Sequence, residues 1–464
     1  MFRDRSDLLA DNPPFRGYGA AVTAGPDGPL VFVGGFGDAN RVLRTEDGDV
    51  VDAACGVLAD DGRHAIGVAA ADLDADGREE VYVHNVASFG GTSAEADLLL
   101  DPEGEGSRWR DLFADPVNRG RENYRVGRSI AAVDRLGTGR YGLFVTGYGA
   151  PARFYEVGDD GGITDLADAV GLDVVTGGRS VATGPILSER TDLFVGAERG
   201  PNLLLRNAGG KFVDVAREYG VDDPEENARG AALVTPDGAP TPDIVCGNWN
   251  GANRLFARGD ADDDGFRDTA PPALARPARV RTVVAADFDN DRRTELFVNC
   301  LGAPNRLLTY GDDGWTQTGV GDALEPEGMG TGAAVADLDG DGTLELLVVH
   351  GEAEAQPLSL YSAPNDGDWL RVLPRTPAGA PARGARVVLR TDAGRQVRVV
   401  DGGSGYLCQM EPVAHFGLGS AVPQAVTIRW PDGRERTVTD PPARTTIRPA
   451  HPGSPSLADR GSGI

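Results

Sequence analysis

The chain has 464 residues, enough for two domains or for one large repeat array with a smaller module. Aromatic residues make up only 6%, and the 65 glycines favour a turn-rich β protein over a helical bundle. The net charge of −26 argues against nucleic acid or an anionic membrane as a partner, and no run of 18 apolar residues predicts a membrane span.

The charged residues are unusual in kind as well as in number. Among the 45 basic residues only Lys211 is a lysine. An acidic excess with arginine in place of lysine is typical of halophilic proteins from salt-accumulating cells; a GC-rich genome combined with acidic calcium loops is the alternative explanation. The four cysteines are far apart in sequence, so we expect buried structural thiols rather than a metal or redox site.

A short apolar motif recurs along the chain at intervals of 50 to 62 residues. Its runs include EVYV, DLFV, ELFV and ELLV, which predict β-strands. Self-similarity at such a period predicts a propeller or a solenoid of seven units. The third residues of the seven runs are Phe32, Tyr82, Phe144, Phe194, Val245, Phe297 and Leu347.

Each unit contains four predicted strands, which is the content of one propeller blade. In the fourth unit they are expected over 179–183, 192–197, 201–207 and 211–216. The seventh unit ends after its third strand, whereas Met1–Pro13 resembles the fourth strand of the fourth unit, with Phe2 and Asp4 matching Phe212 and Asp214. We therefore expect the N-terminus to complete the last blade and to close a seven-bladed β-propeller over residues 1–365, which leaves no exposed edges.

The remaining chain breaks this period. Residues 366–449 contain short alternating runs separated by Gly, Pro and Asp, which predict a small separate all-β domain. Residues 450–464 are rich in Gly, Ser and Pro and are predicted to be a disordered tail. Because the first predicted strand begins at residue 2, there is no room for a signal peptide, so a cytoplasmic location is expected unless a leader has been removed.

With these residues in view, the repeats resemble FG-GAP/VCBS repeats, as in integrin α-chain propellers, in which a DxDxDG loop joins the first two strands of a blade. The C-terminal segment resembles the ASPIC/UnbV domain in the runs GARVVL, GGSGYLCQ, HFGLG and VTIRWPDG (384–389, 402–409, 415–419 and 426–433). The combination is similar to the cartilage acidic protein family. The resemblance implies calcium binding and a role in adhesion or recognition, and it implies secretion, from which this chain departs.

Three acidic loops have the spacing of a calcium loop, with oxygen donors at alternate positions. EF-hand loops lie between helices, whereas these lie between predicted strands. In the sixth unit, Arg292 replaces the glycine of the turn. A solvated acidic hairpin is the alternative for each loop. The expected ligands, counting the backbone carbonyls of Arg78, Arg293 and Thr343, are Asp72, Asp74, Asp76, Arg78 and Glu80; Asp287, Asp289, Asp291, Arg293 and Glu295; and Asp337, Asp339, Asp341, Thr343 and Glu345.

A fourth acidic run, from Asp260 to Asp268, matches the spacing better than the sixth unit but follows a third strand instead of a first. Asp268 is already explained there as the Asp that recurs in fourth strands. The corresponding loops of the first, third, fourth and fifth units, such as that of Asp134, lack the acidic pattern and are expected to be metal-free. About three Ca²⁺ sites are therefore predicted.

Four consecutive units begin their first strand with arginine, at Arg128, Arg179, Arg229 and Arg281. In a propeller these positions meet at the central mouth, and clustered like charges cost free energy unless an anion answers them. A pocket for a small anionic ligand is one interpretation; pairing with acidic neighbours such as Glu225 or Glu226 and a protein-binding surface are the others. Further candidates for the mouth are His84, Tyr148, Asn248 and Trp249.

The sequence favours a calcium-binding recognition module for a small anionic ligand or a protein partner. The alternative is a lyase- or cyclase-type enzyme at the same mouth, using His84 or His350 with the arginines. None of the five histidines lies in a known catalytic motif, so no catalytic residue is assigned. The sequence indicates neither the ligand nor the oligomeric state.

Overall fold

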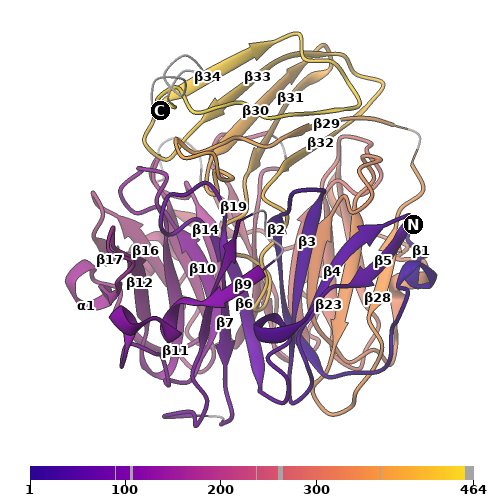
Figure 1. The fold of residues 1–464 in the computed structure, drawn as a ribbon. Coiled ribbons are helices and arrows are strands. Elements are labelled where there is room, and N and C mark those ends of the chain that lie inside the picture. Colours follow the sequence, from indigo (N-terminus) through magenta and orange to yellow (C-terminus); the bar gives the residue numbers. More distant parts are fainter. Residues whose placement is uncertain (89, 105–107, 237, 260–264, 366, 455–464) are drawn as a thin grey trace.

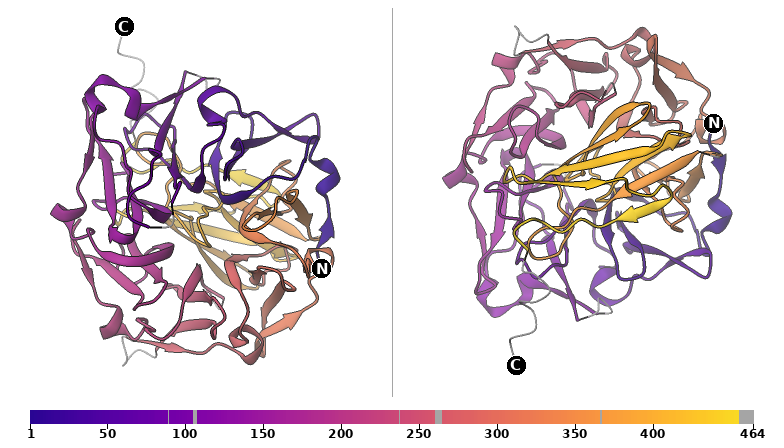
Figure 2. Two further views of the ribbon diagram at one scale, coloured as in Figure 1. Left: turned by 90° about the horizontal axis from the view of Figure 1, so that it is seen from below. Right: turned by 90° about the horizontal axis from the view of Figure 1, so that it is seen from above.

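The computed structural model of the chain describes residues 1–88, 90–104, 108–236, 238–259, 265–365 and 367–454. Within these ranges the first 28 strands form five four-stranded sheets and one eight-stranded sheet that joins two further four-strand units. The sheets are arranged around a central axis, and the C-terminal strands lie across one end of it (Figure 1, Figure 2). The predicted all-β fold is confirmed.

In six of the units the four strands follow one another in chain order from the axis outwards; in the seventh, β26, β27 and β28 do so and β1 is outermost. The innermost strands are β2 (Gly17–Ala24), β6 (Ala65–Ala71), β10 (Gly127–Val133), β14 (Val175–Gly184), β18 (Ala228–Val234), β22 (Val280–Ala286) and β26 (Gly330–Ala336). The second strands are β3 (Pro29–Gly35), β7 (Glu80–Asn85), β11 (Gly142–Pro151), β15 (Asp192–Ala197), β19 (Asp243–Asn248), β23 (Glu295–Cys300) and β27 (Glu345–His350).

The outer half of each unit is shorter and more exposed. The third strands are β4 (Arg41–Glu46), β8 (Leu98–Glu103), β12 (Arg153–Val157), β16 (Leu203–Asn207), β20 (Arg254–Arg258), β24 (Arg306–Gly311) and β28 (Ser359–Ser362). The outermost strands are β5 (Asp49–Asp52), β9 (Arg108–Asp111), β13 (Ile163–Asp165), β17 (Phe212–Asp214), β21 (Phe266–Asp268), β25 (Gly314–Thr318) and, from the N-terminus, β1 (Arg3–Asp4).

Short helical turns follow the outermost strands or lie close to them. The α-helices are α1 (Ala167–Val170), α2 (Ala216–Tyr219) and α3 (Pro272–Ala275), and the 3₁₀ turns are η1 (Ser6–Leu8), η2 (Gly56–Leu58), η3 (Leu112–Ala114), η4 (Pro116–Asn118) and η5 (Asp322–Leu324). Among the described residues, no helix has the length and apolar character needed to cross a membrane.

The innermost strands contact one another in order from β2 to β26, and β26 in turn contacts β2. The N-terminal strand β1 pairs antiparallel with β28, with Arg3 opposite Ser362 and Asp4 opposite Tyr361. Phe2 is buried beside Phe288 and Phe297 of the neighbouring unit. Apolar clusters fill the space between successive units, so each unit buries its faces against its neighbours.

The C-terminal module consists of two further sheets packed face to face. One has the order β32-β29-β35 and the other the order β31-β30-β33-β34. Their facing side chains, among them Leu370, Val387, Phe416 and Ile428, form a single apolar core. The bounds are β29 (Asp368–Val372), β30 (Arg386–Thr391), β31 (Gly394–Val399), β32 (Ala414–Gly419), β33 (Pro423–Arg429), β34 (Glu435–Thr439) and β35 (Thr445–Ile447).

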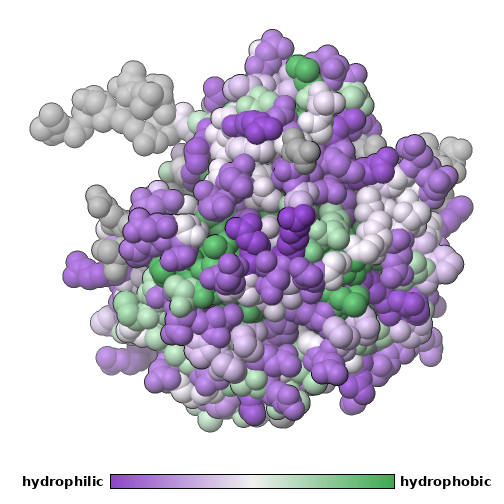
Figure 3. All heavy atoms as spheres, turned by 90° about the vertical axis from the view of Figure 1, so that its right-hand side faces the viewer, coloured by the Kyte–Doolittle hydropathy of each residue, from purple (hydrophilic) through white to green (hydrophobic). Residues whose placement is uncertain are grey.

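The first residues of the predicted disordered tail pack against this module. His451 is buried, lies edge-on to Trp430 and contacts Asp432 through Nε2 at 3.1 Å. Residues 450–454 therefore belong to the module in this structure, and 455–464 lie outside the described residues. The face shown in Figure 3 is largely hydrophilic, with apolar side chains in small separate patches.

Segment 402–410, which we name the channel segment, leaves the C-terminal module and runs between the innermost strands. It forms hydrogen bonds to all seven of them. Gly402 O and Gly403 O accept from β10 and β14; Gly405 exchanges two bonds with Ala231 of β18; and Tyr406 N donates to Thr282 of β22. Ala333 N of β26 donates to Cys408 Sγ, and Gln409 bonds Ala20 O of β2 and, through its side chain, both N and O of Ala70 in β6.

Candidate functional site

The three predicted calcium loops all connect an innermost strand to the second strand of its unit. In each loop, three carboxylates bring one oxygen apiece to within 4.8 Å of the others. The groups are Asp72, Asp74 and Glu80; Asp287, Asp289 and Asp291; and Asp337, Asp339 and Glu345. Asp76 lies outside the first group and accepts a hydrogen bond from Arg78 N.

The same backbone geometry holds each loop together. The first Asp accepts through Oδ2 from the amide five residues later, at 3.1 Å for Gly77, 3.0 Å for Arg292 and 3.1 Å for Gly342. The closing Glu accepts through Oε2 from the residue after that Asp: Leu73, Phe288 or Leu338. Arg292 adopts φ +82°, close to the +94° and +86° of the corresponding Gly77 and Gly342, so replacing the glycine leaves the turn unchanged.

Two of the three loops, 72–80 and 287–295, contain buried carboxylate oxygens that accept no hydrogen bond from the protein. Oε1 of Glu80, Oε1 of Glu295 and Oδ1 of Asp287 are buried without a hydrogen-bond partner. Burial and repulsion from Asp287 and Asp289 raise the pKa of Glu295 to about 10, and burial and repulsion from Asp339 and Asp337 raise that of Glu345 to about 9. A hard cation would satisfy these oxygens and relieve the repulsion, so this donor set fits Ca²⁺.

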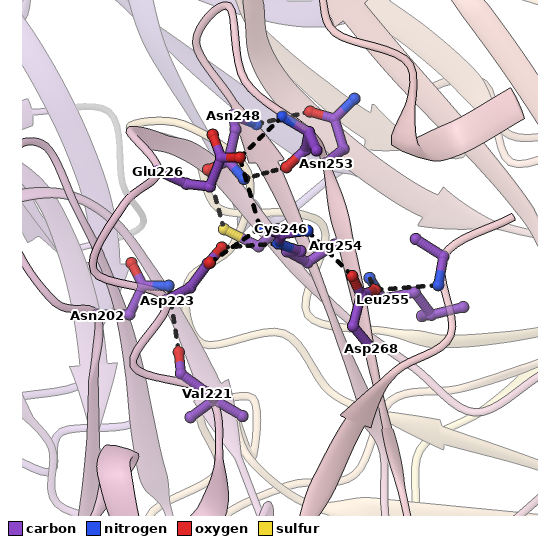
Figure 4. Close-up of polar contacts among 12 residues, drawn as sticks. Asn202, Val221, Asp223, Glu226, Cys246, Asn248, Asn253, Arg254, Leu255 and Asp268 are labelled. Carbon is purple, nitrogen blue, oxygen red and sulfur yellow. Dashed lines mark hydrogen bonds and ion pairs between the residues drawn. The ribbon is translucent and has the colours of Figure 1, made fainter. Parts of the chain in front are cut away.

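A loop that lacks the acidic pattern uses backbone amides instead. Asp134 of the third unit accepts from the amides of Gly137, Thr138 and Gly139 at 2.7 to 3.0 Å, and among the described residues it belongs to no group of three possible metal ligands. The fourth acidic run lies outside the described residues except for its last part. There, Asp268 accepts from Leu255 N and Ala270 N, which ties β21 to β20 (Figure 4).

The four predicted arginines do meet, at the end of the channel opposite the calcium loops. In every innermost hairpin the pairing register shifts near the start of the first strand, and each arginine is the residue at this bulge or within it. A bulge redirects a side chain away from the normal alternation of a strand. The repeated bulge thus explains why residues about 50 positions apart gather at one place.

The four guanidinium groups lie over two aromatic rings. Arg128 and Arg179 lie over Tyr148 at 4.7 and 4.5 Å, measured from the guanidinium carbon to the ring centroid. Arg229 and Arg281 lie over Trp249 at 5.3 and 4.5 Å. Cation–π contacts of this kind are each worth about 0.5–2 kcal/mol.

Two carboxylates neutralise part of the positive charge of the four arginines. Glu198 pairs with Arg179 through Nε at 2.7 Å and with Arg229 at 3.0 Å, and Glu352 pairs with Arg281 at 2.7 Å. Burial raises the pKa of Glu198, but Arg179 and Arg229 outweigh it and lower the pKa to about 2. In the described residues Arg128 has no carboxylate partner, so four guanidinium groups face two carboxylates.

Sequence reasoning did not find the residue at the centre of this cluster. The hydroxyl of Tyr406, from the channel segment, accepts hydrogen bonds from Arg179 Nη1 and Arg281 Nη1, both at 3.3 Å. Burial raises the pKa of this phenol, but the four surrounding arginines lower it below its ordinary value. The glycine-rich run GGSGYLCQ was the available signal; what it lacked was any indication that it reaches the opposite end of the channel.

The other mouth candidates are engaged in local structure. His84 is buried; Asp97 contacts its Nδ1 at 2.7 Å, and its Nε2 accepts from Gly127 N. His350 contacts Pro357 O and Glu325 through its two ring nitrogens. Asn248 is buried and donates to Ala252 O.

Glu226, one of the acidic residues suggested as a partner of the four arginines, pairs with a different arginine. Glu226 pairs with Arg254 at 3.4 Å, and Arg254 also contacts Asp223 and Asp268 (Figure 4). The carboxylates at the mouth, Glu198 and Glu352, instead follow the ends of β15 and β27. The contacts of Arg254 with Asp223, Glu226 and Asp268 are therefore separate from the cluster of four arginines.

Comparison with known proteins matches two family descriptions to this chain. Residues 376–455 match "ASPIC and UnbV", and residues 237–298 match "FG-GAP-like repeat". Cartilage acidic protein 1 of Xenopus tropicalis is 42% identical over 484 residues, covering 95% of this chain and 74% of the relative. The protein of the same name from Homo sapiens is 43% identical over 465 residues, covering 91% and 70%.

Solved structures with a similar fold are more distant. The lectin BP39L of Burkholderia pseudomallei matches with a TM-score of 0.48 and 14% identity, over 75% of this chain and 99% of the lectin. The SapL1 lectin, solved with alpha methyl fucoside, matches with a TM-score of 0.40 and 13% identity, over 65% and 95%. These scores are too low to support an argument about function.

Proposed function

The chain belongs to the cartilage acidic protein 1 family, and from this premise we propose that it is a calcium-binding recognition module built on a closed seven-bladed propeller. Each four-strand unit is then one blade. Two observations support closure: the contact of β26 with β2, and the pairing of β1 with β28. Closure by the N-terminal strand joins the two ends of the array without an exposed edge.

One observation carries the calcium proposal. Three loops at the same position of their units bring carboxylates together, and two of them leave buried oxygens of Glu80, Asp287 and Glu295 without a protein donor. An acidic hairpin in contact with water would have no reason to bury such oxygens unpaired. Calcium supplies a divalent charge there; the chain supplies the carboxylates and the backbone amides that orient them.

Calcium stoichiometry tests this proposal directly. Equilibrium dialysis of the full chain is expected to give about three bound Ca²⁺ ions. Glu295→Gln removes one carboxylate at similar size and is expected to lose one ion, whereas Asp134→Asn, in a loop closed by amides, should keep all three. A wild-type protein that binds no Ca²⁺ would rule the proposal out.

At the mouth we propose a site for a small anion, either free or as part of a protein partner. Its support is the excess of four guanidinium groups over two carboxylates in a chain whose net charge is −26. Tyr406 fills the channel behind the cluster, so the ligand would approach from the solvent side, where the side chain of Glu352 is 38% exposed. Charge-assisted hydrogen bonds from arginine favour carboxylate or phosphate oxygens.

Native mass spectrometry of the calcium-loaded protein tests this site, using a small-molecule extract of the source cells as ligand mixture. A species retained unchanged by the wild type and by Arg390→Ala, an exposed arginine of β30, but lost in Arg281→Ala, supports binding at the mouth. No retained species, or retention equal in both variants, would contradict it. Consumption of a species would indicate an enzyme, which the engaged ring nitrogens of His84 and His350 do not favour.

A further inference from the structure

The C-terminal module contacts the proposed calcium ligands themselves in the loop 287–295. Gly417 N, in β32, donates to Oδ2 of Asp287 at 3.1 Å, while Oδ1 of the same carboxylate is buried without a partner. Gly419 N donates to Asn290 O at 2.8 Å, and His415 Nε2 contacts Asn290 Oδ1 at 2.6 Å. One carboxylate thus presents one oxygen to the module and leaves the other for a cation.

The loop 337–345 is contacted in the same way. Arg371 Nη1, in β29, donates to Oδ2 of Asp337 at 2.7 Å, and Asp337 N donates to Glu411 at 3.2 Å. Arg371 also pairs with Glu411. Asn290 Nδ2 donates to Gly342 O, so the two loops are bonded to each other as well as to the module.

The loop 72–80 differs, although it lies on the same face. Among the described residues, Oδ2 of its first carboxylate, Asp72, accepts from Gly77 N within the loop and from no residue of the module. The module contacts this loop at Gly77, which lies beside Ala378, and at Glu79, which pairs with Arg383 at 2.5 Å; neither is an expected side-chain ligand. Arg383 in turn donates to Met410 O of the channel segment, and Glu80→Gln leaves that pair in place. The chain therefore contains two loops whose ligands contact the module and one matched loop whose ligands do not.

These contacts lie next to the channel segment in the sequence. Glu411 directly follows Met410, the last residue of the segment, and β32 begins three residues after Glu411. When Asp337 and Asp287 hold Glu411 and β32 in place, the position of Tyr406, a few residues earlier in the chain, is restricted as well. The interface also contains a cavity of about 130 Å³, lined by apolar residues and by polar ones such as Asp287, Asp401 and His415, so the module and the sheets are not closely packed at this point.

We propose that calcium in the loops 287–295 and 337–345 holds the C-terminal module against the sheets and thereby keeps Tyr406 seated among the four arginines. The cation fixes the carboxylate orientation that presents Oδ2 to Gly417 and Arg371. Without it, repulsion among the loop carboxylates favours rearrangement of the same groups. Calcium on one face is in this way linked to the state of the mouth on the other. The inference rests on the calcium sites of the proposed function.

Hydrogen exchange of the full chain, followed by mass spectrometry of peptides covering 402–410, tests this link. Amides of Gly405, Tyr406, Leu407 and Gln409 donate to the innermost strands, so their exchange reports the seating of the segment. We expect Ca²⁺ to slow this exchange at least about tenfold relative to EGTA at equal ionic strength. Amides of β15, in a unit without a calcium loop, should not respond and serve to detect global unfolding.

Variants separate the link from general stability. With Ca²⁺ saturating, Glu295→Gln and Glu345→Gln should each lose one ion and most of the protection of 402–410, whereas Glu80→Gln should lose one ion and keep that protection. Asn290→Gly retains all carboxylates of the loop. Glycine is chosen because Gly340 occupies the corresponding position of the loop 337–345. This variant should keep three ions yet exchange faster at 402–410, and it remains informative if a Glu variant fails to fold.

The outcomes distinguish this inference from the proposed function. If wild-type protein binds three ions but exchange at 402–410 is the same with Ca²⁺ and EGTA, the link is wrong and the calcium sites stand. Equal loss of protection in all three Glu variants would also overturn it, because the effect would then be general. If no ion binds at all, the proposed function fails first.

Discussion

Residues at equivalent positions of the repeated units have the same surroundings where the backbone conformation is the same. Arg128, Arg179, Arg229 and Arg281 could be predicted to meet because each occupies the same bulge, whose position follows from the spacing. Their partners could not be predicted in this way. Glu198 and Glu352 occur at single units, and Tyr406 comes from a separate module, so no periodic signal places them.

Gly342 shows how tightly one loop residue is held against the module. A Cβ at this position would overlap the ring of Trp369, whereas a Cβ at Gly340 meets nothing within 4 Å. Both residues have positive φ, +86° and +79°, so alanine costs about 1–2 kcal/mol of backbone strain at either site. We expect Gly342→Ala to lose about 1–3 kcal/mol more than Gly340→Ala in denaturant unfolding. Equal losses would mean that Trp369 yields at no cost.

Tyr406 should titrate differently from the other buried tyrosines. Its pKa lies below the ordinary value in the folded chain, whereas burial raises the pKa of Tyr82 and Tyr141 well above it. A depressed pKa adds stability above the pKa of the unfolded chain, and this contribution is lost as pH falls through the folded value. Absorbance at 295 nm should show one phenolate forming ahead of the ordinary tyrosine titration, and this step should be absent in Tyr406→Phe; identical titration curves would contradict this.

At the scale of elements, the four-strand order of each unit and the position of the three acidic loops were accessible from sequence. The local alternation of apolar and polar residues and the turn residues determine both. The third residues of the seven recurring apolar runs, from Phe32 to Leu347, all lie in second strands. The N-terminal match to a fourth strand was accessible for the same reason, since Phe2 and Asp4 fit the recurring pattern of an aromatic or apolar residue two positions before an Asp. What sequence did not indicate is the joining of β11 to β14, which depends on an extension specific to that hairpin.

The N-terminal strand should contribute strongly to stability despite its two paired residues. Phe2 is buried against Phe288 and Phe297, so Phe2→Ala removes a packed aromatic side chain between the first and last parts of the chain. The expected loss is about 3 kcal/mol or more in the free energy of unfolding. Val213→Ala, at a half-exposed position of β17, is the control and should change it by less than about 0.5 kcal/mol. A similar small change at Phe2 would argue against closure through β1.

At the scale of the whole molecule, charge is divided between the two parts. Residues 366–449 hold twelve arginines and eight acidic residues, a net charge of +4 in a chain of −26. The positive module lies on the face that carries the acidic loops, with Arg371 on Asp337 and Arg383 on Glu79. Sequence patterns predicted a separate module; its docking depends on contacts between residues hundreds of positions apart, which local patterns do not encode.

Calcium removal should destabilise the molecule as a unit. At a hundredfold excess over its Kd, each ion adds about 2.7 kcal/mol, or about 8 kcal/mol for three sites. For a chain of this length that corresponds to a fall in Tm of about 8 °C when EGTA replaces Ca²⁺. Scanning calorimetry at matched NaCl separates site binding from screening of the net charge. An unchanged Tm would mean that calcium does not stabilise the folded chain.

The channel segment has a consequence for synthesis. All seven innermost strands precede it in the chain, and β27 ends 60 residues before Met410. At 5–20 residues per second, the ribosome therefore needs about 3–12 s after β27 to supply the residues that fill the centre. During this interval the four arginines contact water in place of Tyr406. A chain that stops before residue 402 lacks the segment that fills the space between the innermost strands. A segment made after all seven innermost strands thus fills the space that they enclose.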